Sequence, residues 1–204
     1  MDIIDKLAEV FKEFPGIGER QARRFVYFLM YKNPTYSENL RDLISELKKD
    51  VAQCQECFRF FILGNKKEKL CDICANTNID FSILMVVEKD SDLESVKKSR
   101  VYNGKYFVLG GLVPIVEKNT KSRIRIEELK NKIKKEEKNL KEIILAFSLS
   151  PQGDHTDSYV REQIKDLAEK QKVKISSLGK GLSTGTELEY SDNDTLKNAL
   201  KNRQ

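Results

Sequence analysis

The chain has 204 residues, of which 39% are hydrophobic and 34% are charged, with a formal net charge of +5. This length allows one large domain or two to three small modules. No apolar run is long enough to span a membrane, and the acidic, amphipathic start does not resemble a signal peptide, so we expect neither. The mild positive charge permits nucleic-acid binding without demanding it, and we expect a soluble, intracellular protein.

The first 52 residues carry the apolar periodicity of helices. One stripe runs from Ile3 to Phe14, a second from Ala22 to Met30, and a third from Leu40 to Val51. Apolar residues spaced by three and four positions predict amphipathic helices. The breaks at Pro15-Gly16 and Asn33-Pro34 predict turns between them.

The first turn, Phe14-Pro15-Gly16-Ile17-Gly18, has the composition of a tight glycine hairpin, and basic residues follow it directly. A helix that begins after such a hairpin exposes unpaired backbone N–H groups, which suit a phosphate. Gly16 and Gly18 with Arg20 and Arg24 therefore predict a helix-hairpin-helix that holds DNA by its backbone. The alternative is an ordinary helix turn with a solvated basic face. We expect Ile17 to be a packing residue.

All four cysteines of the chain fall in two short pairs, Cys54-x2-Cys57 and Cys71-x2-Cys74. Two C-x2-C turns deliver the four soft ligands of a tetrahedral zinc ion, and four thiolates leave no open position for catalysis. We therefore predict one structural zinc ion in a module at about 53–77, with the Gly64-Asn65 loop and its basic run as the reversal. Two disulfides or free core thiols are the alternatives; an intracellular chain gives disulfides no oxidising context, and the chain uses no cysteine elsewhere.

Beyond residue 77 the pattern changes to unbroken apolar runs that alternate with helical stretches. Strands are expected at 83–87, 106–109, 143–147 and 173–175, and helices at about 91–99, 126–140 and 156–171. Such alternation predicts a parallel sheet covered on both faces. Ligands of these sheets bind beyond the carboxyl ends of the strands. A capping box at 191–194 predicts a last helix that ends near Lys201.

Three segments follow the predicted strands at that edge: Glu88, Gly110-Gly111 and Ser148-Leu149-Ser150. Glu88 opens an acidic run with Asp90, Asp92 and Glu94, which could bind Mg²⁺. The third strand is followed by a single acid, Asp154, so the opposing metal ligands are missing. His155, the sole histidine, is expected on the surface. No nucleophile-elbow serine or phosphate-binding loop motif is present.

In this order the elements resemble the RecR family of bacterial recombination mediators over essentially the full length. The resemblance is carried by the hairpin, the four cysteines, Met85-Val86-Val87-Glu88, Val108-Leu109-Gly110-Gly111 and, most specifically, the closing stretch 179–190 with Asp192 and Thr195-Leu196. It implies an α/β multi-module chain: a helix-hairpin-helix at 1–52, a four-cysteine zinc finger at 53–77, a Toprim domain at 78–178 and a C-terminal extension with a helix at 179–204.

The resemblance also implies a function. Family members form dimeric or tetrameric rings that encircle or clamp DNA, and they work with RecO and in some settings RecF to help RecA load on gapped or single-stranded DNA. Binding without sequence preference is expected from the hairpin, because its groups contact phosphates and not bases. Arg20 and Arg24 fall where the family carries basic residues facing DNA. Glu88 falls on the first Toprim acid, a candidate partner contact. The implied location is the bacterial cytoplasm, at the nucleoid.

One departure bears on catalysis. Toprim enzymes carry Asp-x-Asp after the third strand, where this chain has Ser148 and Ser150, and the family's two glutamates are replaced by Gln152 and Asp154. We therefore expect no enzymatic activity. A Toprim-type metal-dependent phosphotransferase is the alternative, and a zinc-stabilised adaptor that binds only proteins is a third possibility.

Overall fold

A computed structural model describes residues 1–64, 69–115, 124–182, 185 and 187–201. The chain divides into two compact units, Met1–Val51 and Ala52–Gln204, called here the hairpin unit and the sheet unit. Their helices are α1 Ile3–Lys12, α2 Glu19–Met30, α3 Pro34–Asp50, α4 Asp72–Ala75, α5 Asp90–Ser99, α6 Ile126–Lys135, α7 Pro151–Gln171, η2 Leu188–Tyr190 and α8 Asn193–Lys201. Their strands are β1 Val51–Gln53, β2 Phe60–Ile62, β3 Asp80–Val87, β4 Gly104–Val108, β5 Glu142–Ala146 and β6 Lys174–Ser177.

The hairpin unit consists of three helices, as the periodicity predicts. Asp2 caps α1 by accepting from the Asp5 N–H, and Asn33 caps α3 with Pro34 in its first turn. Proline suits that position because the first amides of a helix have no intrahelical partner. The small core of α1 and α2 contains Ala8, Ala22 and Val26 with partly buried apolar neighbours. Ile17 packs against this core, which confirms it as a packing residue.

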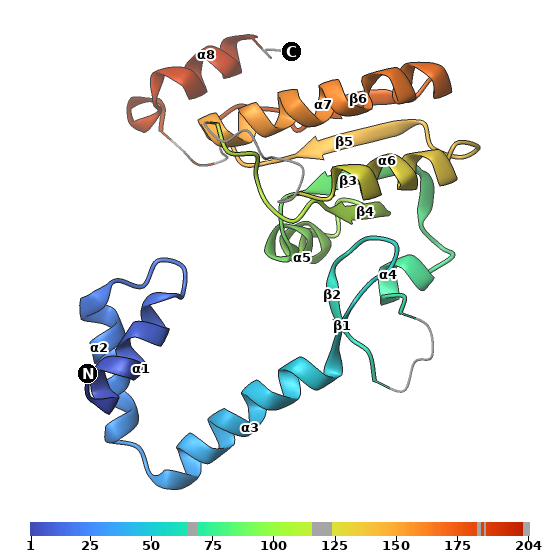
Figure 1. Ribbon diagram of the computed structural model, residues 1–204. Coiled ribbons are helices and arrows are strands. Elements are labelled where there is room, and N and C mark those ends of the chain that lie inside the picture. Colours follow the sequence, from blue (N-terminus) through green and yellow to red (C-terminus); the bar gives the residue numbers. More distant parts are fainter. Residues whose placement is uncertain (65–68, 116–123, 183–184, 186, 202–204) are drawn as a thin grey trace. The chain divides into compact units, whose positions relative to one another are not determined.

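The sheet unit contains a four-stranded parallel sheet in the order β4-β3-β5-β6 (Figure 1). Central β3 pairs with both β4 and β5; Val87 is level with Val108 on one side and with Ala146 on the other. Because the strands are parallel, their carboxyl ends meet at one edge of the sheet. The predicted parallel sheet is confirmed, and Glu88, Gly110 and Ser148 all follow strands at this edge.

Both faces of the sheet are buried, but by different elements. Leu84, Val86 and Phe107 belong to a core that α6 and α7 complete with Leu129, Ile133, Val160 and Ile164. Met85, Val87 and Tyr106 face the other way and pack with Leu93 of α5 and with the cysteines. The described residues of the range 53–77, called here the cysteine module, therefore share a core with the sheet. Side chains alternate in this way because successive residues of a strand point to opposite faces.

Some boundaries differ from those expected. Helix α7 begins at Pro151, five residues earlier than predicted, because Ser150 is its N-cap and Pro151 suits the first turn. Helix α6 ends at Lys135, before the predicted 140. The cap of α8 is Asp192 rather than Ser191, since the Asp192 carboxylate accepts from the Thr195 N–H at 2.8 Å. Residues 65–68 of the knuckle loop and 183, 184 and 186 of the closing stretch lie outside the described residues.

No helix in the described part of the chain is long and apolar enough to cross a membrane.

Candidate functional site

The turn between α1 and α2 has the geometry of a glycine hairpin. Gly16 adopts φ +78°, a left-handed conformation that favours glycine, and the Ile17 N–H donates to the Phe14 carbonyl at 3.1 Å. Gly18 is the N-cap of α2 and provides no side-chain cap, and a Cβ at either glycine would meet nothing within 4 Å. Residues 18–20, where α2 begins, are exposed, and the exposed start of a helix is the arrangement that receives a phosphate.

The three arginines of α2 have different surroundings. Arg23 donates to the Asp5 carboxylate on α1 at 2.9 Å and lies 3.7 Å from Glu19. The charge of Asp5 raises the pKa of Arg23 above its ordinary value. Arg20 and Arg24 are exposed; Arg24 makes a 3.4 Å contact with Gln21 on its own helix, and Arg20 has no side-chain partner among the described residues. The hairpin thus leaves Arg20 and Arg24 available to a ligand, while Arg23 is engaged.

The four cysteines come together in the cysteine module. Their sulfur atoms lie within 4.8 Å of one another, and the Cys57 and Cys71 sulfurs are 3.6 Å apart. Zinc–sulfur bonds of about 2.3 Å place the sulfurs of a tetrahedral site roughly 3.8 Å apart, so the spacing fits the ion. All four are free cysteines, and three of them are buried. The cluster can therefore hold a metal ion.

The thiols strongly affect one another. Hydrogen bonds with Cys57 and Cys71 lower the pKa of Cys54, whereas the corresponding contact with Cys54 raises the pKa of Cys57. Four thiolates at this spacing require a cation, because like charges in a buried cluster oppose one another's ionisation. The Cys71 N–H donates to the Cys54 sulfur at 3.4 Å, as knuckle amides do toward a thiolate.

Two buried cations accompany the cluster. Lys132 of α6, which is 5% exposed, pairs with Glu136 at 2.9 Å and Glu56 at 3.2 Å. Burial alone would lower the pKa of Lys132, but these carboxylates and the Cys74 sulfur raise it. Arg59 is 8% exposed and pairs with Asp72. Both cations are paired with carboxylates, and Lys132 also interacts electrostatically with the Cys74 sulfur.

At the carboxyl edge of the sheet, the main chain after β3 is joined to the main chain after β4. The Gly110 N–H donates to the Glu88 carbonyl at 2.9 Å, and Gly110 has φ +99°. Arg125 covers this glycine, since a Cβ there would lie 2.6 Å from its guanidinium. The Glu88 side chain is 18% exposed, with Lys89 at 3.8 Å.

The rest of the acidic run is engaged by the protein itself. Asp90 accepts from the Phe60 N–H at 2.7 Å, Asp92 from the Lys89 N–H at 3.3 Å, and Glu94 pairs with Arg59 at 2.8 Å. These carboxylates therefore support the fold, and the sequence pattern that suggested a magnesium site has a structural explanation.

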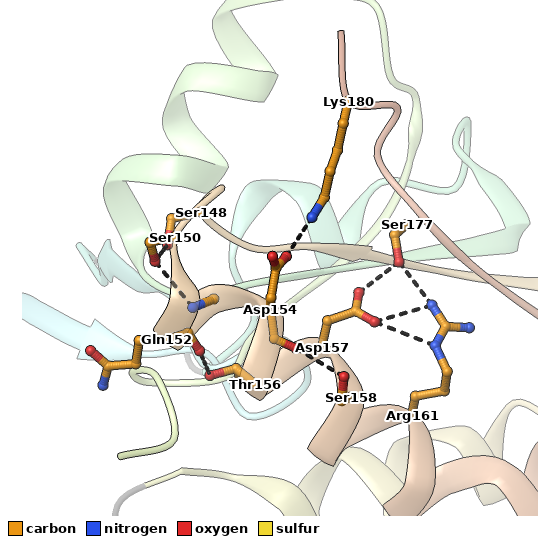
Figure 2. Close-up of polar contacts among 11 residues, drawn as sticks. Ser148, Ser150, Gln152, Asp154, Thr156, Asp157, Ser158, Arg161, Ser177 and Lys180 are labelled. Carbon is orange, nitrogen blue, oxygen red and sulfur yellow. Dashed lines mark hydrogen bonds and ion pairs between the residues drawn. The ribbon is translucent and has the colours of Figure 1, made fainter. Parts of the chain in front are cut away.

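Polar side chains in the segment after β5 are likewise engaged by contacts within the protein (Figure 2). The Ser148 and Ser150 hydroxyls are 3.0 Å apart, and Ser150 accepts from the Gly153 N–H at 3.1 Å as the cap of α7. Lys180 pairs with Asp154 at 2.5 Å, and Figure 2 shows the Gln152 side chain turned away from that pair. The edge thus has a hydroxyl pair and a lysine–aspartate pair where a two-metal site would need several carboxylates.

Several of these partners were not identified from the sequence. Arg59 forms an ion pair with Glu94, and Lys180 forms one with Asp154. In each pair the two residues are far apart in the sequence, so no local pattern indicates the contact. The role of Ser150 could have been found from the sequence, because serine followed by proline is typical of a helix N-terminus and here marks the start of α7. His155 is exposed, as predicted.

Known proteins and family models that match this chain indicate its class. A family model for the Toprim domain matches residues 83–178, and one for the RecR C-terminal region matches residues 181–204. The recombination protein RecR of Amoebophilus asiaticus is 33% identical over 201 residues, which cover 98% of this chain and 95% of that protein. The RecR of Legionella pneumophila strain Philadelphia 1 is 32% identical over 203 residues, with 100% and 96% covered.

The RecR of Ureaplasma urealyticum is 30% identical over 203 residues, which cover 98% of this chain and 94% of that protein. The chain belongs to the RecR family of recombination proteins. The predicted resemblance is thereby confirmed. These relatives are named as recombination proteins and not as enzymes.

Proposed function

We propose that this protein is a non-enzymatic DNA-binding mediator of recombinational repair, which acts with RecO-type and RecF-type partners to help RecA load on gapped or single-stranded DNA. The observation that carries the proposal is the full-length relationship to RecR proteins, combined with a glycine hairpin without a side-chain cap in front of two exposed arginines. The partners themselves come from the family resemblance.

DNA would be held by its phosphates. The open amides at the start of α2 offer donors to one phosphate, and Arg20 and Arg24, one helical turn apart, flank it. Such contacts fix position without reading bases, so binding is independent of sequence. One hairpin meets few phosphates, so several copies in an oligomer raise affinity through effective concentration.

Helix α3 supports an oligomer. It buries none of its 17 residues, and Leu43, Ile44 and Leu47 on one side of it are 55–61% exposed. A contiguous apolar stripe of this kind on a helix is typical of a surface that another protein covers. We assign it to a second copy of the chain in a dimeric or tetrameric ring.

The lack of catalysis is supported by the edge of the sheet. Phosphoryl transfer with two metal ions needs carboxylates that hold both, whereas here Asp90 and Glu94 are engaged by the cysteine module and Asp154 by Lys180. Within the described residues, the Glu88 carboxylate has no hydrogen-bond donor from another element. We assign it to the contact with a RecO-type partner.

The ion in the cysteine cluster is proposed to be zinc with a structural role. Four thiolates are the ligand set of structural zinc sites, and such ions supply the folding energy of short knuckles. Each chain would hold one ion through Cys54, Cys57, Cys71 and Cys74.

A salt titration of DNA binding tests the hairpin. Affinity for a gapped duplex is measured between about 50 and 200 mM salt, where the logarithmic slope is about −0.9 for each phosphate neutralised on duplex. The double variant Arg20→Ala with Arg24→Ala should reduce this slope by about two for each hairpin engaged and weaken binding evenly across sequences.

Arg23→Gln is the matched control, because it removes the same charge from the same helix but from a guanidinium that Asp5 already holds. Its slope should stay close to that of the wild type. Mass in solution, measured in parallel, should be that of a dimer or tetramer for all three proteins. Equal slopes for the wild type and the double variant would contradict DNA binding by the hairpin, and a monomeric wild type would contradict the ring.

A further inference from the structure

Four consecutive residues, 57–60, connect the cysteine module to the sheet, beginning with the second cysteine of the first pair. The Cys57 carbonyl accepts from the Val108 N–H at 2.8 Å, which joins the knuckle to the end of β4. The Phe58 ring packs edge-on against Phe107, with centroids 5.4 Å apart. Arg125 lies over the same Phe58 ring and donates to the Val108 carbonyl at 3.0 Å.

The next two residues reach the start of α5. Arg59 bridges Glu94 at 2.8 Å and Asp72 at 3.0 Å, and Asp72 follows Cys71 of the second cysteine pair. The Phe60 N–H donates to the Asp90 carboxylate at 2.7 Å. Both cysteine pairs are therefore linked to α5, the second through Asp72 and Arg59.

These contacts end beside the edge where Glu88 lies. Asp90 is two residues after Glu88, and Val108 is two residues before Gly110, whose N–H donates to the Glu88 carbonyl. The cysteine module thus contacts the chain just after Glu88 and the end of the neighbouring strand β4.

The conformation of the connecting segment depends on the knuckle. Phe58 adopts φ +62°, which is unfavourable for a residue with a side chain, and its N–H donates to the Cys54 carbonyl. A metal ion that holds Cys54 and Cys57 together keeps this turn closed. Without the ion the turn can relax, and the Cys57 carbonyl and the Phe60 N–H then lose their fixed positions.

We propose that metal binding by the four cysteines sets the conformation of the sheet edge around Glu88, with Asp90 and Arg59 as the positioning residues that transmit it. This inference rests on the metal ion proposed above. Because coupling between two sites is reciprocal, the edge contacts also strengthen metal binding.

The first test is metal affinity in the full chain. Zinc is titrated against a chromophoric chelator in the wild type and in three variants: Asp90→Ala, Asp90→Asn and Asp92→Ala. Asp90→Ala removes the acceptor of the Phe60 N–H and should weaken zinc binding about tenfold, as loss of outer-shell partners does. Asp90→Asn keeps an acceptor oxygen and should restore most of the affinity.

Asp92→Ala is the matched control. It removes a carboxylate from the same turn of α5, but one whose partners, the Lys89 N–H and Ser91, lie on the same segment. Its zinc affinity should equal that of the wild type. Equal zinc affinity of Asp90→Ala and Asp92→Ala would overturn the proposal.

The second test is hydrogen exchange before and after zinc removal by a chelator. In the wild type, removal should speed exchange at 88–94 and 108–111 as well as in the cysteine module. In Asp90→Ala the edge at 88–94 should already exchange faster, and removal should add less. If removal changed only residues 53–77, coupling would be refuted while the metal site itself stood; a protein that binds no zinc would refute both.

Discussion

Gly153 is the position at which a single methyl group should disturb the sheet edge most directly. It lies in the first turn of α7, and a Cβ built there would lie 1.9 Å from the Ser148 carbonyl oxygen. Real Cβ atoms keep at least 3.0 Å from such neighbours, so the two backbone segments would have to separate by more than an ångström. Neither is a flexible side chain that could turn aside.

The sign of the effect is therefore opposite to the usual one. Replacing glycine by alanine inside a helix normally gains about 1 kcal/mol. At Gly153 overpacking costs about 1–3 kcal/mol, and displacing α7 weakens the Ser150 cap, which is worth about 1 kcal/mol. We expect Gly153→Ala to destabilise the protein by about 1–3 kcal/mol, which corresponds to about 2–4 °C in melting temperature for each kcal/mol.

Thermal unfolding of the metal-loaded protein by calorimetry measures this change. Gly179→Ala is the matched control, because its backbone has no left-handed φ and a Cβ there meets nothing within 4 Å. That variant should melt at or slightly above the wild-type temperature, since alanine restricts the unfolded chain. A Gly153→Ala protein that melted as high as the wild type would refute the close approach of α7 to Ser148.

Three further predictions concern the metal, the partner and pH. Cys71→Ser should lower the zinc content below one ion per chain, measured by elemental analysis, and lower the melting temperature of the sheet as well, because the cysteines share its core. Glu88→Gln should weaken binding to a RecO-type partner in calorimetry with an unchanged melting temperature; unchanged affinity would remove Glu88 from that contact. A hydrogen bond from Ser176 lowers the pKa of Glu142, and Lys174 lowers it further. The ionised Glu142 carboxylate therefore stabilises the fold above its unfolded pKa of about 4.3. This contribution is lost as the pH falls through the folded pKa. Glu142→Gln should therefore lower the free energy of unfolding at pH 7, measured by urea unfolding, and lower it progressively less towards pH 4. An equal decrease at both pH values would contradict this prediction.

The sequence by itself determined the features that depend on local pattern. The apolar runs around Val86, Phe107 and Leu145 predicted parallel strands, because residues buried on both faces of a sheet must be apolar without interruption. The paired spacing of the cysteines predicted the four-cysteine cluster, since two short turns are enough to bring four thiols together. The hairpin at Gly16 followed from the same kind of local rule.

Only the tertiary structure decided which charged groups are occupied and what covers the sheet. The acidic run after β3 suggested a metal site, but Phe60 and Arg59 bind Asp90 and Glu94 across about thirty residues of chain. Lys180 reaches Asp154 in the same way. Periodicity and spacing describe neighbours along the chain, whereas these pairs form because the sheet and the cysteine module are packed into one core. The sequence therefore located the candidate sites, and packing determined which of their side chains remain available to a ligand.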